Sequence, residues 1–227
     1  MTPNRLTKNS LAVLMVFAVV ALSGTLFRGI SLHAMATVSV GAFSTEGLAG
    51  WEDKPFKGAT DYTLVTEDSK TVLKAHSVQS ASAKIYKIDA NAKETPMLRW
   101  SWKVERTLAR EDITRKQGDD FAARVYVVFP QTFFWQTRAI NYVWAANMPK
   151  ESIAPSPYTD HNQLVAVESG DDQAGQWKHE ERNIFDDYRR IFHEEPPAVG
   201  DIAVMTDTDD TKDEVTAWYG DITLGRE

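Results

Sequence analysis

The 227-residue sequence contains no cysteine, which excludes disulfides, a thiolate nucleophile and cysteine-ligated zinc or iron–sulfur sites. Acidic residues are absent up to Glu46, although the whole chain carries 32 of them. The five histidines have no HExxH or paired spacing, which argues against a zinc hydrolase. The sequence also has no P-loop, no GxSxG nucleophile turn and no GxGxxG turn opening a helix, so it offers no nucleotide-binding or serine-hydrolase motif.

The amino-terminal region has the pattern of a secretory signal peptide. Arg5 and Lys8 precede an unbroken apolar run at residues 11–22, and small residues follow, ending in an A-x-A motif at residues 34–36. This pattern predicts a signal helix within a cleaved signal peptide at residues 1–36, and an uncleaved membrane anchor is the alternative. Both interpretations predict a periplasmic or secreted body that meets the membrane only through this segment.

The remaining chain is acidic. Residues 37–227 hold all 32 acidic residues but only 22 of the 25 basic ones. This charge argues against binding to nucleic acid, which needs a basic patch. The length of this part fits one large domain with its own core. We therefore expect a single domain over residues 37–227.

Hydrophobic alternation with a period of two dominates this domain. At residues 97–104 the side chains of Leu98, Trp100, Trp102 and Val104 share one face of a predicted strand. Further strands are predicted by alternation and by β-branched and aromatic content. They cover residues 62–66, 71–75, 81–88, 121–129, 139–145, 164–168, 202–206 and 215–224.

One helix interrupts the predicted strands. Residues 183–192 place four apolar side chains on one stripe, Asn183 can cap the start, and Pro196 prevents continuation. Residues 131–135 and 148–160 are expected to be long loops. The expected fold is all-β: a two-sheet antiparallel, jelly-roll-like sandwich with one short helix near residues 183–192.

Several short motifs resemble known families. The order of Gly50-Trp51, Leu98-Arg99-Trp100 and the closing Ala217-Trp218-Tyr219-Gly220-Asp221-Ile222 resembles galactose-binding-like and carbohydrate-binding jelly-roll modules.

A second set of motifs resembles domain-of-unknown-function family 3047, a family of exported bacterial proteins. This set spans nearly the whole body of the chain. Its members are Leu98-Arg99-Trp100-Ser101-Trp102, Gly118-Asp119-Asp120-Phe121-Ala122-Ala123-Arg124-Val125-Tyr126, Asn141-Tyr142-Val143-Trp144, Arg182-Asn183 with Asp187-Tyr188-Arg189, and Met205-Thr206-Asp207-Thr208-Asp209. The resemblance implies no activity and no functional residues.

The first candidate ligand site lies at the start of a predicted strand. Asp119 and Asp120 precede Arg124 and Tyr126, and alternation places Asp120, Arg124 and Tyr126 on one face. A carboxylate, a guanidinium and a phenol together could bind a polar ligand. An internal Asp–Arg ion pair is the competing interpretation.

Tryptophans and a helix supply further candidates. Trp100 and Trp102 are expected in the core, whereas Trp135, Trp144 and Trp177 lie in or beside loops, where an indole could stack on a sugar. Arg182 and Asp187 could face a ligand, or could form pairs that only support an exposed helix face. We include Trp144, Arg182 and Asp187 among the candidate ligand-binding residues.

The segment at residues 207–214 resembles the opening of an acidic calcium loop. Asp207 and Asp209 have the D-x-D spacing that suits calcium, but Lys212 and Trp218 occupy positions where an EF-hand needs glycine and glutamate. An acidic hairpin turn is the competing interpretation. Asp221, beside the segment near Glu46, is a separate candidate for structural calcium that rests on the jelly-roll resemblance. No other cofactor is expected.

Three functions remain open. The first is non-enzymatic binding of a polar ligand such as a saccharide or another cell-envelope component. The second is a carbohydrate-active enzyme that uses two carboxylates. The third is a structural or assembly partner that acts through the aromatic residues 133–135.

Overall fold

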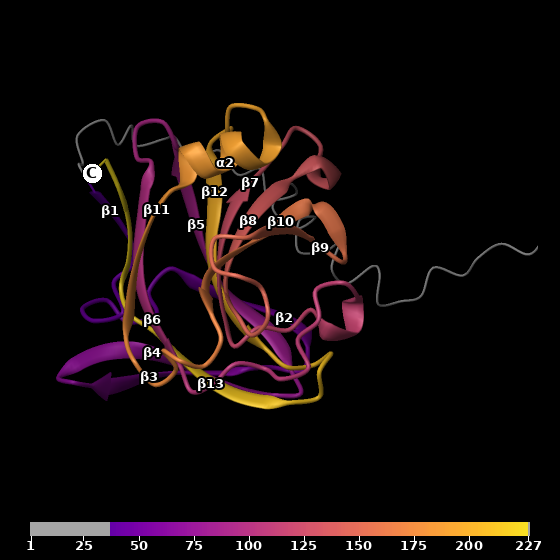
Figure 1. Ribbon diagram of the computed structural model, residues 1–227. Coiled ribbons are helices and arrows are strands. Elements are labelled where there is room, and N and C mark those ends of the chain that lie inside the picture. The colour runs from indigo at the N-terminus through magenta and orange to yellow at the C-terminus, as the bar shows by residue number, and fades with distance from the viewer. Residues whose placement is uncertain (1–36, 227) are drawn as a thin grey trace, which may run out of the picture.

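Two β-sheets packed face to face make up the protein, whose computed structural model describes residues 37–226 (Figure 1). The predicted signal peptide at residues 1–36 lies outside the described residues. Between residues 37 and 226, no helix has the length and apolar character needed to cross a bilayer. The predicted all-β sandwich with one short helix is confirmed.

The first sheet is organised around one strand that pairs on both edges. Its seven strands are β1 (Thr37–Gly41), β3 (Asp61–Glu67), β4 (Lys70–Val78), β6 (Met97–Val104), β11 (Lys178–Asn183), β13 (Glu214–Tyr219) and β14 (Ile222–Gly225). Strand β6 pairs with β11 along one edge and with β13 and β14 along the other. Every pair in this sheet is antiparallel.

The second sheet also has seven strands. In spatial order they are β2 (Trp51–Lys57), β5 (Ala81–Ala90), β12 (Val199–Asp207), β7 (Ala123–Phe129), β8 (Arg138–Ala145), β10 (Thr159–Ser169) and β9 (Ile153–Ser156). All pairs are antiparallel except β8 with β10, which run parallel. Because a strand, β9, lies within residues 148–160, that segment is not wholly the loop that the sequence predicted.

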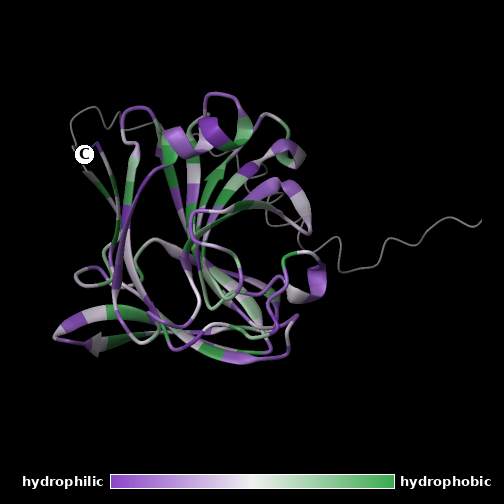
Figure 2. Cartoon of the chain, in the orientation of Figure 1, coloured by the Kyte–Doolittle hydropathy of each residue, from purple (hydrophilic) through white to green (hydrophobic). Residues whose placement is uncertain are grey.

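The core lies between the two sheets, as the alternation predicted. Leu98, Trp102 and Val104 of β6 are completely buried, and Trp100 is 3% exposed. Trp100 stacks on Tyr142 of β8 in the opposite sheet, with 5.4 Å between ring centroids. Figure 2 shows hydrophobic segments along the central strands and hydrophilic ones at the tip of the β3–β4 hairpin. Side chains of β6 that alternate with the buried ones therefore point to the outer face of the first sheet.

Two predicted boundaries differ from the structure because of glycine and of buried acids. The strand predicted over residues 215–224 is broken at Gly220 and Asp221 into β13 and β14. The strand predicted from residue 121 begins at Ala123, because the Phe121 N–H donates to the buried Asp207 carboxylate and the Ala122 carbonyl accepts from the Thr206 hydroxyl.

The acidic segment between β12 and β13 is not a hairpin turn. Strand β12 pairs with β5 and β7 in the second sheet, whereas β13 pairs with β4 and β6 in the first. The segment therefore connects the two sheets, which explains why it bends tightly against buried groups. Its Thr208 and Thr211 side chains are buried.

The helix α2 (Ile184–Phe192) lies at one end of the sandwich (Figure 1). The Asn183 side chain accepts a hydrogen bond from the backbone N–H of Asp186 at 3.0 Å, so the predicted cap is confirmed. Ile184 and Tyr188 pack into the core between the sheets. Two single-turn 3-10 helices, η1 (Lys116–Gly118) and η2 (Phe134–Gln136), lie in the connections around β7.

Candidate functional site

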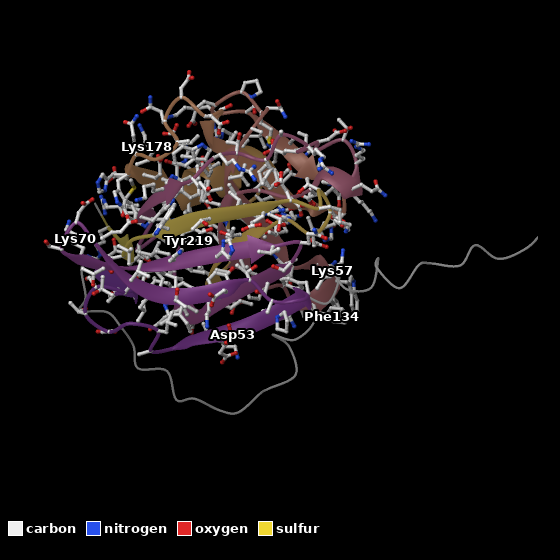
Figure 3. All side chains as sticks on the ribbon, turned by 90° about the horizontal axis from the view of Figure 1, so that it is seen from below. Asp53, Lys57, Lys70, Phe134, Lys178 and Tyr219 are labelled. Carbon is white, nitrogen blue, oxygen red and sulfur yellow. The ribbon has the colours of Figure 1, made fainter. Side chains whose placement is uncertain are left out.

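A groove of about 640 Å³ lies on the outer face of the first sheet, around the break between β13 and β14. The tip of the β3–β4 hairpin forms one wall, and β11 with the preceding loop forms another. Figure 3 shows Lys70 of the hairpin and Lys178 of β11 on the same side of the molecule. The volume lies in the range of small-molecule sites.

The break itself depends on a glycine. The backbone N–H of Gly220 donates to the Ser101 carbonyl at 2.8 Å, and a Cβ at this position would lie only 2.2 Å from Ser101 Oγ. A side chain at this position would require the Ser101 hydroxyl to move away. The next residue, Asp221, accepts from the backbone N–H of Ser44 at 2.9 Å, which ties the end of β1 to the groove.

Two tryptophans hold a lysine beside the groove. The ammonium of Lys103 lies 4.4 Å from the ring centroid of Trp218 and 5.4 Å from that of Trp177, and it donates to Glu67 of the hairpin. Cross-strand pairing of Lys103 with Trp218 places both side chains on the outer face. Trp177, which lines the groove, is only half-buried, so part of its indole remains available to a ligand.

Charged and hydroxyl groups line the rest of the groove. Arg99 on β6 and Glu181 on β11 are cross-strand neighbours and form an ion pair at 2.5 Å. Ser101 and Thr223 contribute hydroxyl groups. The groove thus combines an indole with planar charged groups and hydroxyls, a combination that suits a polar ligand with both C–H and O–H surfaces.

Glu180 has a shifted pKa, but its carboxylate lies on the core face of β11 and not in the groove, because Glu180 pairs across the strands with the buried Trp100. Its Oε1 accepts a hydrogen bond from the indole N–H of Trp102 at 3.1 Å. Burial raises the pKa of Glu180 to about 6, and the charge of Glu168 adds to the effect. The indole N–H of Trp100, whose ring packs in the core, is a buried donor without a partner.

The residues predicted around Arg124 form an internal network. The Arg124 guanidinium is 2% exposed and pairs with Asp207 at 2.5 Å and with Asp119 at 3.1 Å. Burial opposes its charge, but the neighbouring carboxylates outweigh burial and hold the pKa of Arg124 above its usual value. Tyr126 lies 3.3 Å from the same guanidinium. The internal ion pair that the sequence left open as an alternative is present.

Asp120 does not share the face of Arg124. It precedes β7, and its carboxylate accepts from the backbone N–H groups of Asp210 and Thr211 at 2.9 and 2.5 Å. Asp119 and Asp120 are therefore both engaged inside the protein, and neither lies in the groove.

The other predicted ligand residues also lie outside the groove. Trp144 is completely buried and donates to the Gly170 carbonyl at 3.0 Å, so the expectation that it is exposed beside a loop is wrong. Arg182 pairs with Asp187 at 3.0 Å and with Glu151 at 2.9 Å. Asp187 also accepts from the Tyr142 hydroxyl at 2.8 Å, which ties α2 to β8 in the second sheet.

The three acids predicted for calcium are not brought together. Asp207 is paired with Arg124, Asp221 contacts Ser44, and Asp209 contacts Lys57 at 3.1 Å. Of the three, only Asp209 belongs to a group of carboxylates close enough to share an ion.

Sequence reasoning identified Trp177 but missed most of the groove. The register of β6 with β13 makes Lys103 and Trp218 neighbours, and the register of β6 with β11 makes Arg99 and Glu181 neighbours. The polar face of the strand predicted at residues 97–104 could have indicated this groove, because Arg99 and Lys103 alternate there with the buried residues.

One comparison with known proteins agrees with the family resemblance of the sequence motifs. The model of the family described as "Protein of unknown function (DUF3047)" matches residues 49–223 and confirms the resemblance found in the motifs. No curated protein matches the sequence.

Solved structures with a related fold have low sequence identity. The family 30 carbohydrate-binding module of a cellulosomal cellulase of Clostridium thermocellum is 11% identical, with a TM-score of 0.49 over 85% of this chain and 99% of that one. The K3 cleaved adhesin domain of Lys-gingipain from Porphyromonas gingivalis is 11% identical, with a TM-score of 0.44 over 84% and 99%. A CBM29-2 mutant complexed with mannohexaose is 8% identical, with a TM-score of 0.42 over 83% and 89%. These levels of similarity carry no information about a ligand of this chain.

Proposed function

Because this chain belongs to the DUF3047 family of proteins of unknown function, we propose its function from the geometry of its own groove. The groove on the first sheet binds a saccharide or a similarly polar ligand without catalysing a reaction. Export through residues 1–36 would place this groove outside the cytoplasm, where cell-envelope saccharides occur.

The half-buried indole of Trp177 carries this proposal. It lines a groove of about 640 Å³ together with Arg99, Glu181 and hydroxyl groups. Sugars present apolar C–H faces that stack on aromatic rings, while their hydroxyls accept hydrogen bonds from a guanidinium and donate them to a carboxylate. The Lys103 ammonium, 5.4 Å from the centroid of the Trp177 ring, holds the indole in place and reduces the freedom that binding would remove.

Calorimetric titration with a panel of cell-envelope and plant oligosaccharides tests the proposal. Trp177→Ala is expected to weaken binding by about tenfold, which corresponds to about 1.4 kcal/mol of lost stacking. Trp135→Ala is the matched control, because Trp135 is 52% exposed and lies outside the groove. Equal affinities for the wild type and Trp177→Ala would contradict the proposal.

The same two variants distinguish saccharide binding in the groove from assembly with a protein partner. Phe133, Phe134 and Trp135 form an exposed aromatic cluster, with Phe133 stacked on Trp135 at 4.8 Å between ring centroids. If Trp135→Ala abolishes capture of a protein partner while Trp177→Ala does not, the aromatic loop and not the groove is the functional surface.

Glu180 favours the enzymatic function as the second candidate. Its pKa of about 6 is a feature of a general acid, and its carboxylate lies on the core face of β11, beside Trp102 and outside the groove. Turnover of a polysaccharide that is lost in Glu180→Gln would support this second candidate. Product formation that is unchanged by Glu180→Gln, or absent over the whole panel, would exclude Glu180 as that acid.

A further inference from the structure

Three carboxylates meet on the connection between β12 and β13. Asp120, Asp209 and Asp210 each offer an oxygen, and these oxygens all lie within 4.8 Å of one another. The group is far from the groove: Figure 3 shows Lys57, which contacts Asp209, on the side of the molecule opposite Lys70.

Local folding explains why these acids are held together despite their repulsion. One oxygen of Asp120, Oδ2, accepts from the backbone N–H groups of Asp210 and Thr211 at 2.9 and 2.5 Å and from the Thr211 hydroxyl at 2.7 Å. The chain therefore turns around this carboxylate. These backbone hydrogen bonds place Asp209 and Asp210 beside the Asp120 carboxylate even when no cation neutralises the three charges.

The second oxygen of Asp120 has no partner. The Asp120 side chain is completely buried, and its Oδ1 makes no hydrogen bond. A buried carboxylate oxygen without a donor or a cation is costly, and native proteins seldom leave one. Burial accordingly raises the pKa of Asp120 to about 6, with Asp209 adding to the effect. The unpartnered Oδ1 is therefore a second indication of a ligand, separate from the clustering of three acids.

The two lysines that contact Asp209 are exposed to solvent. Lys57 contacts the Asp209 carboxylate at 3.1 Å, but its side chain is 52% exposed and can turn into solvent. Lys212 donates to the Asp209 carbonyl and is also exposed. The Tyr158 hydroxyl donates to Asp210 at 2.7 Å, and the ammonium of Lys116 lies over the Tyr158 ring at 4.9 Å.

We propose that Asp120, Asp209 and Asp210 bind a divalent cation, calcium in the first instance, which displaces the Lys57 ammonium from Asp209. Carboxylate oxygens are the ligands that calcium prefers, at about 2.3–2.6 Å. Two oxygens bound to one calcium ion therefore lie at most about 5 Å apart, as these do. Water would complete the coordination shell. Of the acids that the sequence indicated for calcium, this site retains only Asp209.

Thermal unfolding of the purified protein in calcium and in chelator tests the site. Calcium at about 100 times its Kd is expected to raise the Tm by about 5 °C or more, because it binds only the folded state. The shift should disappear in Asp209→Asn, whose carboxylate accepts a hydrogen bond from the movable Lys57, and in Asp120→Asn. The control Asp172→Asn, at an exposed acid elsewhere, should keep the full shift.

Terbium luminescence gives a readout that does not depend on stability. Terbium replaces calcium at oxygen sites, and nearby Tyr158 can sensitise its emission. Lys57→Ala is expected to tighten terbium binding several-fold, because it removes the competing charge, and Asp209→Asn to abolish it. No calcium-dependent Tm shift and no saturable terbium signal in the wild type would overturn the proposal, as would binding that persists in both aspartate variants.

Discussion

At Arg124, burial and ion pairing oppose one another. The guanidinium donates to both oxygens of Asp207, at 2.8 and 2.5 Å, and to the carboxylate and carbonyl of Asp119 at 3.1 and 2.5 Å. Its flat face also lies 4.4 Å from the ring centroid of Phe121. Phe121 N–H and the Ser156 hydroxyl also donate to these carboxylates, but Arg124 supplies the positive charge between them, and its loss would leave two buried carboxylates uncompensated.

Replacement of Arg124 should therefore destabilise the fold. We expect Arg124→Met to lower the free energy of unfolding by about 3–5 kcal/mol in urea titrations. Arg190→Met is the control, because Arg190 also contacts an aspartate, at 2.8 Å, but its side chain is 48% exposed. The control should change stability by less than about 1 kcal/mol. Similar losses of unfolding free energy in the two variants would show that the buried network stabilises the fold no more than an exposed ion pair does.

Glu111 makes stability depend on pH. Its carboxylate accepts from the backbone N–H groups of Ala146 and Asn147 at 2.7 and 3.3 Å. Burial outweighs these hydrogen bonds and raises its pKa from 4.5 to about 7. Between these values the unfolded chain releases the proton while the folded protein retains it. The stabilisation from this group is therefore complete below pH 4.5 and is lost as the pH rises through 7.

Glu111→Gln should remove this pH dependence. The difference in unfolding free energy between wild type and variant is expected to fall by on the order of 3 kcal/mol as the pH rises over this interval. Urea titrations at several pH values measure it. A difference that stays constant, or that grows in favour of the wild type with rising pH, would contradict the assignment.

Among the elements, α2 owes its start to one side chain. Asn183 caps the first turn, Asp186 and Asp187 follow it, and His193 ends the helix in a left-handed conformation with φ 59°. Acids near the start and basic residues near the end also suit the helix dipole.

Removal of the cap should cost a modest amount of stability. Asn183→Ala is expected to lower the free energy of unfolding by about 1 kcal/mol, whereas Asn183→Asp should retain nearly all of it. Chemical denaturation of the three proteins tests this expectation. Equal stabilities of the alanine and asparagine forms would mean that packing of Ile184 and Tyr188 alone fixes the helix.

Element by element, the sequence predicted the buried strands well and the edges poorly. Strand β6 was predicted with its observed bounds, because every second side chain faces the core. Strand β11 was missed because an edge strand with the sequence KHEERN has no apolar face to reveal it. The break between β13 and β14 was missed because it depends on how closely Gly220 approaches β6, which no local pattern records.

The candidate site was harder to predict than the fold for the same reason. Arg124 and Asp119 have side chains that are common in binding sites. Their buried ion-pair partner, Asp207, lies 83 positions from Arg124 in the sequence, so the sequence does not show that the group is internal. Trp177 could be identified because it stands alone in a polar loop. Its neighbours across the sheet depend on register, which the hydrophobic pattern of the separate strands does not determine.

At the scale of the whole molecule, the two proposed sites lie on opposite sides of one sandwich. The groove lies beside Lys70, and the carboxylate group lies beside Lys57 (Figure 3). The cation would link Asp120, which precedes β7, to Asp209 and Asp210 on the connection between the two sheets. Its binding is therefore expected to stabilise the sandwich. The groove lies on the outer face of one sheet, so its occupation needs no change in the core.

The seven tryptophans make the central claim directly measurable. Two-dimensional NMR of the indole N–H groups, recorded during titration with oligosaccharides of the cell envelope, gives one signal for each tryptophan. Binding in the groove predicts a saturable shift of the Trp177 signal, while the exposed Trp135 signal stays in place. A saturable shift of Trp135 with Trp177 unmoved, or no shift of Trp177 at millimolar concentrations of any saccharide in the panel, would contradict it.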